Sequence, residues 1–182
     1  PKRHMTIRDL LSHMSGLTYD FMYKSNVDAA YRKTKLQQAD SLEEMVNILA
    51  GLPLEFSPGD EWNYSVSTDV LGYLVEVLSG MKLDEYFKKN IFEPLDMVDT
   101  DFSCPEEKKD RLAALYEHDP KGDPRLLEIP FLNTKMLSGG GGLFSTMSDY
   151  YNFCSMIIGQ GEFNGKRLIG RKTIELMSCN HL

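Results

Sequence analysis

The stretch that carries most information about fold and function is residues 58–72, PGDEWNYSVSTDVLG. Its Pro-Gly pair marks a turn, and the only tryptophan of the chain, Trp62, stands two residues before Tyr64. Apolar residues then recur at helical spacing from residue 70 up to Gly80, which predicts the most apolar helix of the chain. The segment therefore places a tyrosine at the entrance to a buried helix.

The residues themselves leave two interpretations of Tyr64 open. Its hydroxyl can point into a cleft, where cationic neighbours would lower its pKa and let the phenolate act as a general base. Alternatively, Tyr64 and Trp62 form an aromatic plug whose hydroxyl is satisfied by a neighbour.

The segments on both sides of residues 58–72 predict a chain dominated by helices. Towards the N-terminus, helices are expected at residues 6–11 and 27–36, and a third opens at the capping box of Ser41 and Glu44. Towards the C-terminus, helices are expected at residues 83–92, 146–158 and 171–178. The stretches 112–116 and 126–129 flank a turn-rich segment and predict a hairpin, and Asn164-Gly165 predicts a tight turn.

Composition excludes several classes of function. The 182 residues have 20 Lys and Arg against 27 Asp and Glu, a net charge of −7, so nucleic acid and anionic membrane surfaces are not expected partners. No apolar run reaches the roughly 18–20 residues that span a bilayer. The three cysteines, Cys104, Cys154 and Cys179, are far apart in the sequence, which favours a reducing, cytoplasmic location.

Metal and cofactor sites are not expected. The four histidines lack the close spacing of metal ligands, and no cysteine pair accompanies them. The glycine run at residues 139–142 lacks a phosphate-binding pattern, so backbone freedom or close packing explains it better. The one Ser-x-x-Lys, Ser79 to Lys82, falls where a helix ends and therefore predicts a turn between helices rather than a nucleophile.

Four motifs run in the order typical of the serine β-lactamase superfamily. Residues 6–17, TIRDLLSHMSGL, resemble its "TIRHLLTHTSGL" stretch, and residues 56–65 resemble the "F-x-PG" turn that leads into its catalytic tyrosine. Residues 69–97 are similar to the next helix pair and its "PLGM" end, and residues 139–150 to "GGGGLxSTxxDxxRF". The closest likeness is to the class C branch and the family VIII carboxylesterases.

This resemblance implies the mainly α segment of an α+β serine β-lactamase-like fold, with few short strands or one hairpin and without most of the parent sheet. It implies Tyr64 as a catalytic residue. The family's Ser-x-x-Lys nucleophile motif would precede Pro1, and its late Lys-Thr-Gly or His-x-Gly strand would follow Leu182. We therefore expect residues 1–182 to be a single helical subdomain of a larger hydrolase that is inactive alone.

The resemblance also suggests a substrate. Class C enzymes have Tyr-x-Asn at this motif, whereas the third position here is Val66, which favours a small-molecule ester over a β-lactam. Trp62, Tyr19 and Phe21 would line the substrate cleft. The alternatives are a relative of β-lactamases or D-Ala-D-Ala carboxypeptidases, and a non-catalytic helical interaction domain. Helices without their sheet would expose an apolar face, which favours self-association.

Overall fold

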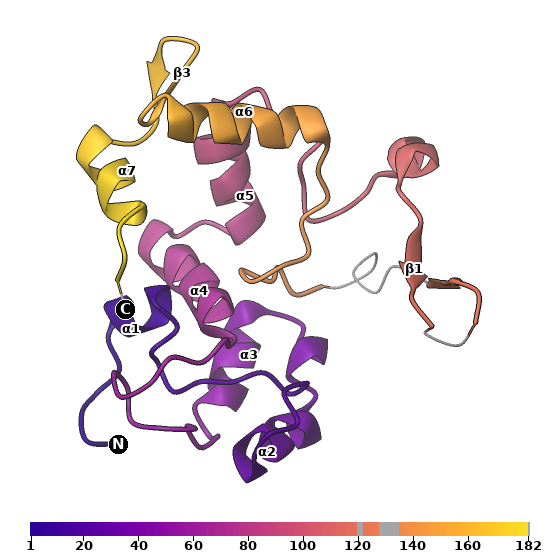
Figure 1. Cartoon of the computed structure of the whole chain (residues 1–182). Helices are drawn as coiled ribbons and strands as arrows, with labels where there is room; N and C mark the ends of the chain where they lie inside the picture. Colours follow the sequence, from indigo (N-terminus) through magenta and orange to yellow (C-terminus); the bar gives the residue numbers. More distant parts are fainter. Residues whose placement is uncertain (120–121, 128–134, 182) are drawn as a thin grey trace.

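The computed structural model describes residues 1–119, 122–127 and 135–181, and within them the chain is mainly helical with two small antiparallel hairpins (Figure 1). This agrees with the predicted helical segment of an α+β fold. In the described part of the chain, no helix is both long enough and apolar enough to cross a membrane.

The helices of the N-terminal half begin at polar caps. Short α1 (Ile7–Leu11) starts at Thr6, α2 (Asn26–Thr34) at Ser25 and α3 (Leu42–Leu49) at Ser41, and each cap hydroxyl accepts a backbone N–H. A single 3₁₀ turn, η1 (Leu36–Gln38), joins α2 to α3. The predicted box at Ser41 is only half formed, because the Glu44 carboxylate accepts the amide of Asp40 instead.

The helix that follows residues 58–66 is α4 (Ser67–Ser79), and it is less buried than its composition predicts. Val77 and Leu78 are 59% and 76% exposed, whereas Ser67, Asp69 and Gly72 are buried. The prediction of a buried helix was wrong in this respect. Because α4 is apolar on several faces, its neighbours α1, α3 and α5 cannot cover all of them.

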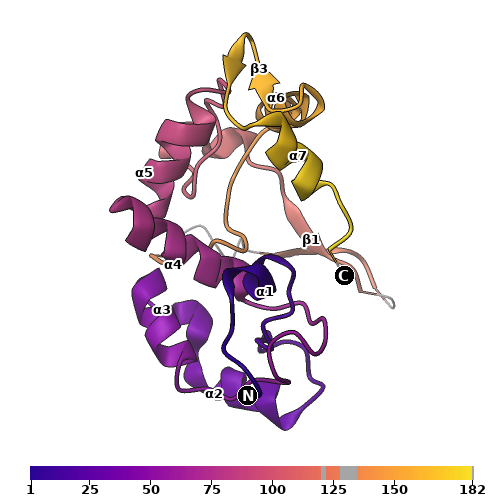
Figure 2. The same ribbon diagram turned by 90° about the vertical axis from the view of Figure 1, so that its left-hand side faces the viewer.

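The C-terminal half begins with α5 (Leu83–Phe87), which continues as a π-helical turn, η2 (Lys88–Phe92), so the predicted helix 83–92 has two geometries. The 3₁₀ helix η3 (Glu106–Arg111) follows. Later come α6 (Met147–Ile158), which lies across one end of the α5 segment in Figure 1, and α7 (Arg171–Met177), which stands apart from α5 in Figure 2.

Both predicted turns form hairpins. Strands β1 (Leu115–Glu117) and β2 (Arg125–Leu127) pair antiparallel, and so do β3 (Glu162–Phe163) and β4 (Lys166–Arg167) around Asn164-Gly165. Residues 128 and 129, the end of the predicted second strand, lie outside the described residues.

Two apolar clusters hold these elements together. The first packs α2, α3 and the start of α5 around Tyr31, Leu42 and Leu83, which are almost fully buried. The second joins the π-helical turn to α6 and α7 through Phe92, Met156 and Ile174, among others.

An ion pair between the exposed Arg3 and the buried Asp9 carboxylate fixes the N-terminal segment to α1. The Arg3 guanidinium donates to both carboxylate oxygens of Asp9 at 2.7 Å, and the Thr6 amide and hydroxyl donate to one of them. Arg3, and after it Thr6, hold the pKa of Asp9 well below its usual range, against the opposing effect of burial. Asp9 therefore stabilises the fold as a carboxylate.

We expect Asp9→Asn to lower the thermal midpoint of unfolding at about pH 7. The difference in midpoint between wild type and this variant should shrink as the pH falls below about 4. The reason is that a depressed pKa contributes stability above the pKa of the unfolded chain and loses it on acidification. Thermal unfolding at several pH values measures this, with the exposed Asp110→Asn as the matched control. A difference between wild type and Asp9→Asn that stays constant with pH would contradict it.

Candidate active site

Hydrogen bonds fix the segment before α4 to the segment after α1. The amides of Gly59 and Asn63 donate to the carbonyls of Met14 and His13, at 2.8 and 2.9 Å. The Asn63 side chain donates to the carbonyl of Leu17 at 2.9 Å. Gly59 has φ +90°, a conformation that favours glycine. These bonds set the position of Tyr64, the next residue.

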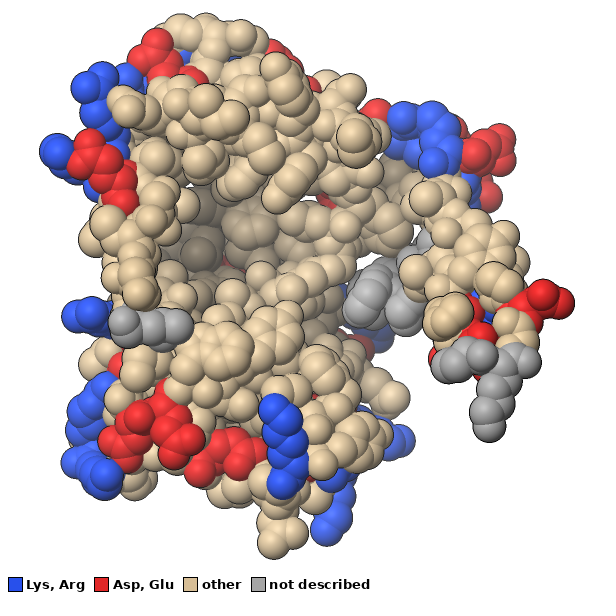
Figure 3. Space-filling view, in the orientation of Figure 1, with Lys and Arg blue, Asp and Glu red and all other residues tan. Residues whose placement is uncertain are grey.

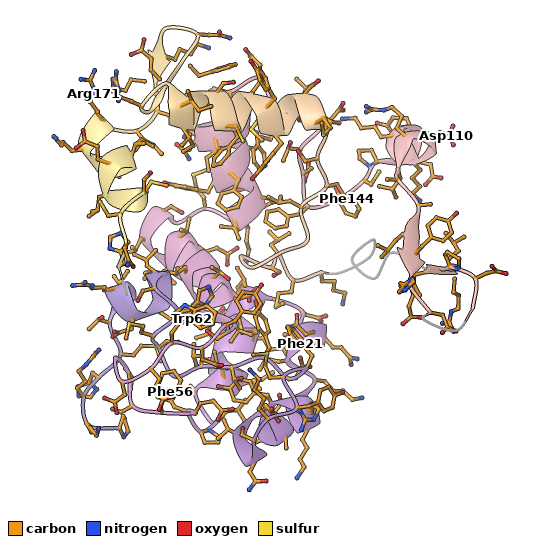
Figure 4. The ribbon with its side chains drawn as sticks, viewed as in Figure 1. Phe21, Phe56, Trp62, Asp110, Phe144 and Arg171 are labelled. Atoms are coloured by element: carbon orange, nitrogen blue, oxygen red, sulfur yellow. The ribbon has the colours of Figure 1, made fainter. Side chains whose placement is uncertain are left out.

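Five rings from these two segments form a row. The order is Trp62, His13, Tyr64, Tyr19 and Phe21, with neighbouring ring centroids 6.1, 5.3, 5.0 and 4.7 Å apart. Trp62 and Phe21, labelled in Figure 4, lie at its two ends. Sequence positions 13, 19 and 21 thus meet positions 62 and 64 because the hydrogen bonds above align the segments.

One side of this row borders a cavity of about 380 Å³. Its lining is mostly apolar and aromatic, and it includes three of the predicted site residues, Tyr64, Tyr19 and Phe21. Trp62 is 54% exposed and touches His13, but it does not line the cavity. The structure therefore brings three of the four predicted residues together around one space and leaves Trp62 outside it.

Other cavity residues were not predicted. Asp69, Ser138 and the glycines 140–142 line the cavity, and so do Gln37, Phe102 and Met136. Asp69 and the glycine run belong to the motifs at residues 58–72 and 139–150, and these motifs are the sequence signal that could have identified them. Gln37, Phe102 and Met136 carry no local signal, because only the tertiary fold brings them here.

Asp69 connects the first turn of α4 to the glycine run. It is 3% exposed, and its Oδ1 accepts the Ser138 hydroxyl at 2.5 Å and the Gly140 amide at 3.2 Å. A Cβ on Gly139 would lie 2.3 Å from the Thr68 carbonyl oxygen, whereas one on Gly141 would meet nothing within 4 Å. Close packing against Thr68 thus explains why residue 139 is a glycine. It is one of the two explanations expected for the glycine run.

The electrostatics of the cavity keep Tyr19 protonated. Burial, and after it the Asp69 carboxylate, raise the pKa of Tyr19 above its ordinary value. Asp69 is the one charged side chain in the cavity lining among the described residues.

The Ser79 and Lys82 pair lies at the turn between α4 and α5, as predicted. The Ser79 hydroxyl donates to the Val75 carbonyl at 2.6 Å, and the Lys82 ammonium lies 3.8 Å from the Glu76 carboxylate. Gly80 follows with φ +69°. Neither side chain reaches the other or the cavity. Within the described residues, no three His, Cys, Asp or Glu side chains gather as a metal site.

Comparison with known proteins identifies the class. The profile of the beta-lactamase family matches residues 1–180. The chain therefore belongs to the beta-lactamase family, and its helices and hairpins are part of the α+β fold of that family.

Individual relatives match the whole chain. Protein Rv1367c of Mycobacterium tuberculosis is 32% identical over 189 residues, covering 100% of this chain and 45% of its own length. Lovastatin esterase of Penicillium rubens is 30% identical over 193 residues, covering 100% and 46%. This chain therefore spans about half the length of the curated relatives it matches.

A solved structure of similar fold supports this assignment to the family. EstCE1, described as a hydrolase with promiscuous acyltransferase activity, superimposes with a TM-score of 0.77 at 26% identity, over 94% of this chain and 49% of that protein. The relatives of this chain thus include hydrolases that act on esters or transfer acyl groups.

The close approach at Gly139 provides a test of the site architecture. Gly139→Ala should lower the free energy of unfolding by about 1–3 kcal/mol, because the new methyl group overlaps the carbonyl of Thr68. Gly141→Ala is the matched control and should change it by less than about 0.5 kcal/mol. Chemical denaturation measures both, and equal effects of the two substitutions would contradict the packing of the glycine run against α4.

Proposed function

We propose that this chain carries the tyrosine base of an ester hydrolase that works through an acyl-enzyme. The observation that carries the proposal is the cavity itself: Tyr64 borders an apolar, aromatic space together with Tyr19 and Phe21. Membership of the beta-lactamase family, in which the resemblance makes Tyr64 the catalytic tyrosine, supports this role.

The proposed mechanism divides the chemistry between this chain and a nucleophile motif outside residues 1–182. A serine of that motif attacks the ester carbonyl, while its lysine and Tyr64 share the proton. Tyr64 then protonates the leaving alkoxide, and water activated by the same pair releases the acid. Because the lining of the described cavity holds no cation, the lysine supplies the positive charge that a phenolate base needs.

The cavity favours an ester with an apolar group. Tyr19 and Phe21 stack with centroids 4.7 Å apart and cover one side. Val66, at the position where class C enzymes have an asparagine, is 1% exposed and packs in the core, so it offers no amide to the substrate. Trp62 is not proposed as a substrate contact, because it lies outside the cavity.

The second candidate is a β-lactamase or D-Ala-D-Ala carboxypeptidase relative, which the name of the matched family supports. The discriminating measurement is the ratio of two activities of the longer polypeptide, with a short-chain p-nitrophenyl ester and with a chromogenic cephalosporin. A cephalosporin efficiency that rivals that of the best ester favours this candidate.

The direct test is Tyr64→Phe in the longer polypeptide that includes a nucleophile motif. Removal of the hydroxyl should reduce kcat/KM for the ester by about 10²–10⁴, the usual contribution of a general acid or base. Tyr151→Phe is the matched control, because Tyr151 is 70% exposed on α6. Near wild-type turnover by Tyr64→Phe would remove Tyr64 from the mechanism.

We also propose that residues 1–182 are one helical subdomain whose uncovered apolar surface favours self-association. Helices α1, α4 and α7 lie on the side that faces the viewer in Figure 2, and on them Ile7, Leu11, Leu78 and Leu176 are 53–76% exposed. In the orientation of Figure 3 the surface is hollowed between α7 and α4, with few charged residues around the hollow.

The isolated chain should therefore form dimers or larger species as its concentration rises. Sedimentation velocity and binding of a hydrophobic dye measure this. Leu78→Gln should reduce both signals, whereas Val98→Gln, which replaces a 78% exposed residue outside these three helices, should not. A chain that stays monomeric at high concentration and binds no dye would contradict the proposal.

A further inference from the structure

Three buried hydroxyls connect His13 to the interior of the protein. Ser15, Ser65 and Ser67 are fully buried. The Ser15 and Ser67 oxygens are 2.7 Å apart, and those of Ser67 and Ser65 are 2.8 Å apart. The Ser65 oxygen lies 3.3 Å from Nδ1 of His13. We call these four side chains the hydroxyl chain.

The buried end of the hydroxyl chain sets its direction. The amide of Leu17 donates to the Ser15 oxygen at 3.2 Å, and an amide N–H can only donate. The Ser15 hydrogen is then free to point to Ser67, the Ser67 hydrogen to Ser65, and the Ser65 hydrogen to His13. In the reverse direction, the Ser15 hydrogen would have no acceptor among the hydrogen bonds of the described residues.

His13 contacts Tyr64 and both of its neighbours in the chain. Its ring lies 5.3 Å from that of Tyr64, at an interplanar angle of 48°. Its carbonyl accepts the amide of Asn63, the residue before Tyr64, and its Nδ1 faces Ser65, the residue after. The backbone of His13 has φ +56°, a left-handed conformation that is uncommon for residues other than glycine.

We propose that the hydroxyl chain holds His13 as the neutral imidazole with its proton on Nε2, and that His13 in this form positions Tyr64 for proton transfer. The second half of the proposal rests on the proposed function of Tyr64. His13 is a positioning residue here, because it acts through Tyr64. Burial lowers the pKa of His13, which agrees with a neutral ring at neutral pH.

The tautomer can be tested on the 182-residue chain without any enzyme assay. In ¹⁵N NMR spectra of histidine-labelled protein, Nδ1 of His13 should give the signal of an unprotonated nitrogen and Nε2 that of an N–H. His4 and His118 are exposed and serve as internal references. His181 is not used as a reference, because its Nε2 lies 2.7 Å from the carbonyl oxygen of Leu176 and must donate to it. A proton on Nδ1 of His13, or a mixture of tautomers like that of the references, would overturn the assignment.

Ser65→Ala tests the cause of the tautomer. This substitution removes the hydroxyl that donates to His13 and leaves the ring contacts, so the His13 signals should move towards those of the exposed histidines. Ser12→Ala is the matched control, because the Ser12 hydroxyl donates only to the carbonyl of Arg8 in its own turn. Unchanged His13 signals in a folded Ser65→Ala variant would overturn the role of the hydroxyl chain.

Kinetics of the longer polypeptide test the positioning role. Two variants, Ser65→Ala and His13→Phe, keep an aromatic ring at position 13 but remove its hydrogen bond to Ser65. Each should lower kcat about tenfold or more and leave KM within about twofold of wild type. Ser12→Ala should leave both constants unchanged. Wild-type kcat in both folded variants, or a change confined to KM, would overturn the positioning role.

The same series separates the two proposals. If Tyr64→Phe lowers ester hydrolysis by the expected factor but Ser65→Ala and His13→Phe do not lower kcat, the proposed function stands and the positioning role is wrong. If Tyr64→Phe leaves turnover unchanged, the proposed function is wrong. The NMR result then still decides the tautomer of His13.

Discussion

Buried polar side chains on the first turn of α4 constrain the rest of the site. Ser67 and Asp69 are 0% and 3% exposed, and a buried hydroxyl or carboxylate without partners would cost about 1–3 kcal/mol or more. The Ser67 hydroxyl forms hydrogen bonds with the hydroxyls of Ser15 and Ser65. The Asp69 carboxylate accepts the Ser138 hydroxyl and the Gly140 amide. Three segments far apart in the sequence therefore meet at one helix end, and the cavity lies where they meet.

This arrangement gives the two tyrosines of the cavity different surroundings. Tyr19 is 6% exposed, and its burial, and after it the Asp69 carboxylate, raise the pKa of its hydroxyl, whereas Tyr64 is 44% exposed. Tyr64 also contacts a histidine on its other side. The cavity thus contains one tyrosine that is buried beside a carboxylate and a second tyrosine that is partly exposed.

Much of the local structure could be predicted from the sequence because it depends on residues close together. Neighbouring residues alone specify the helix caps at Thr6 and Ser41, the turn at Asn164-Gly165 and the short last helix. Predictions were less successful where the tertiary fold decides the outcome. The exposure of α4 depends on what its neighbours cover, and the π-helical turn after Phe87 lies where Phe92 packs against α6 and α7.

The sequence by itself determined the family and the position of Tyr64, because both are recorded in motifs whose members are only a few residues apart. Only the tertiary structure decided which side chains surround that tyrosine. In the structure, Tyr19 and Phe21 line the cavity and Trp62 lies outside it. His13 lies within hydrogen-bond distance of Ser65. The physical reason is that backbone hydrogen bonds between residues 13–17 and 59–63 set these distances, and no pattern within either segment specifies how the two will be aligned.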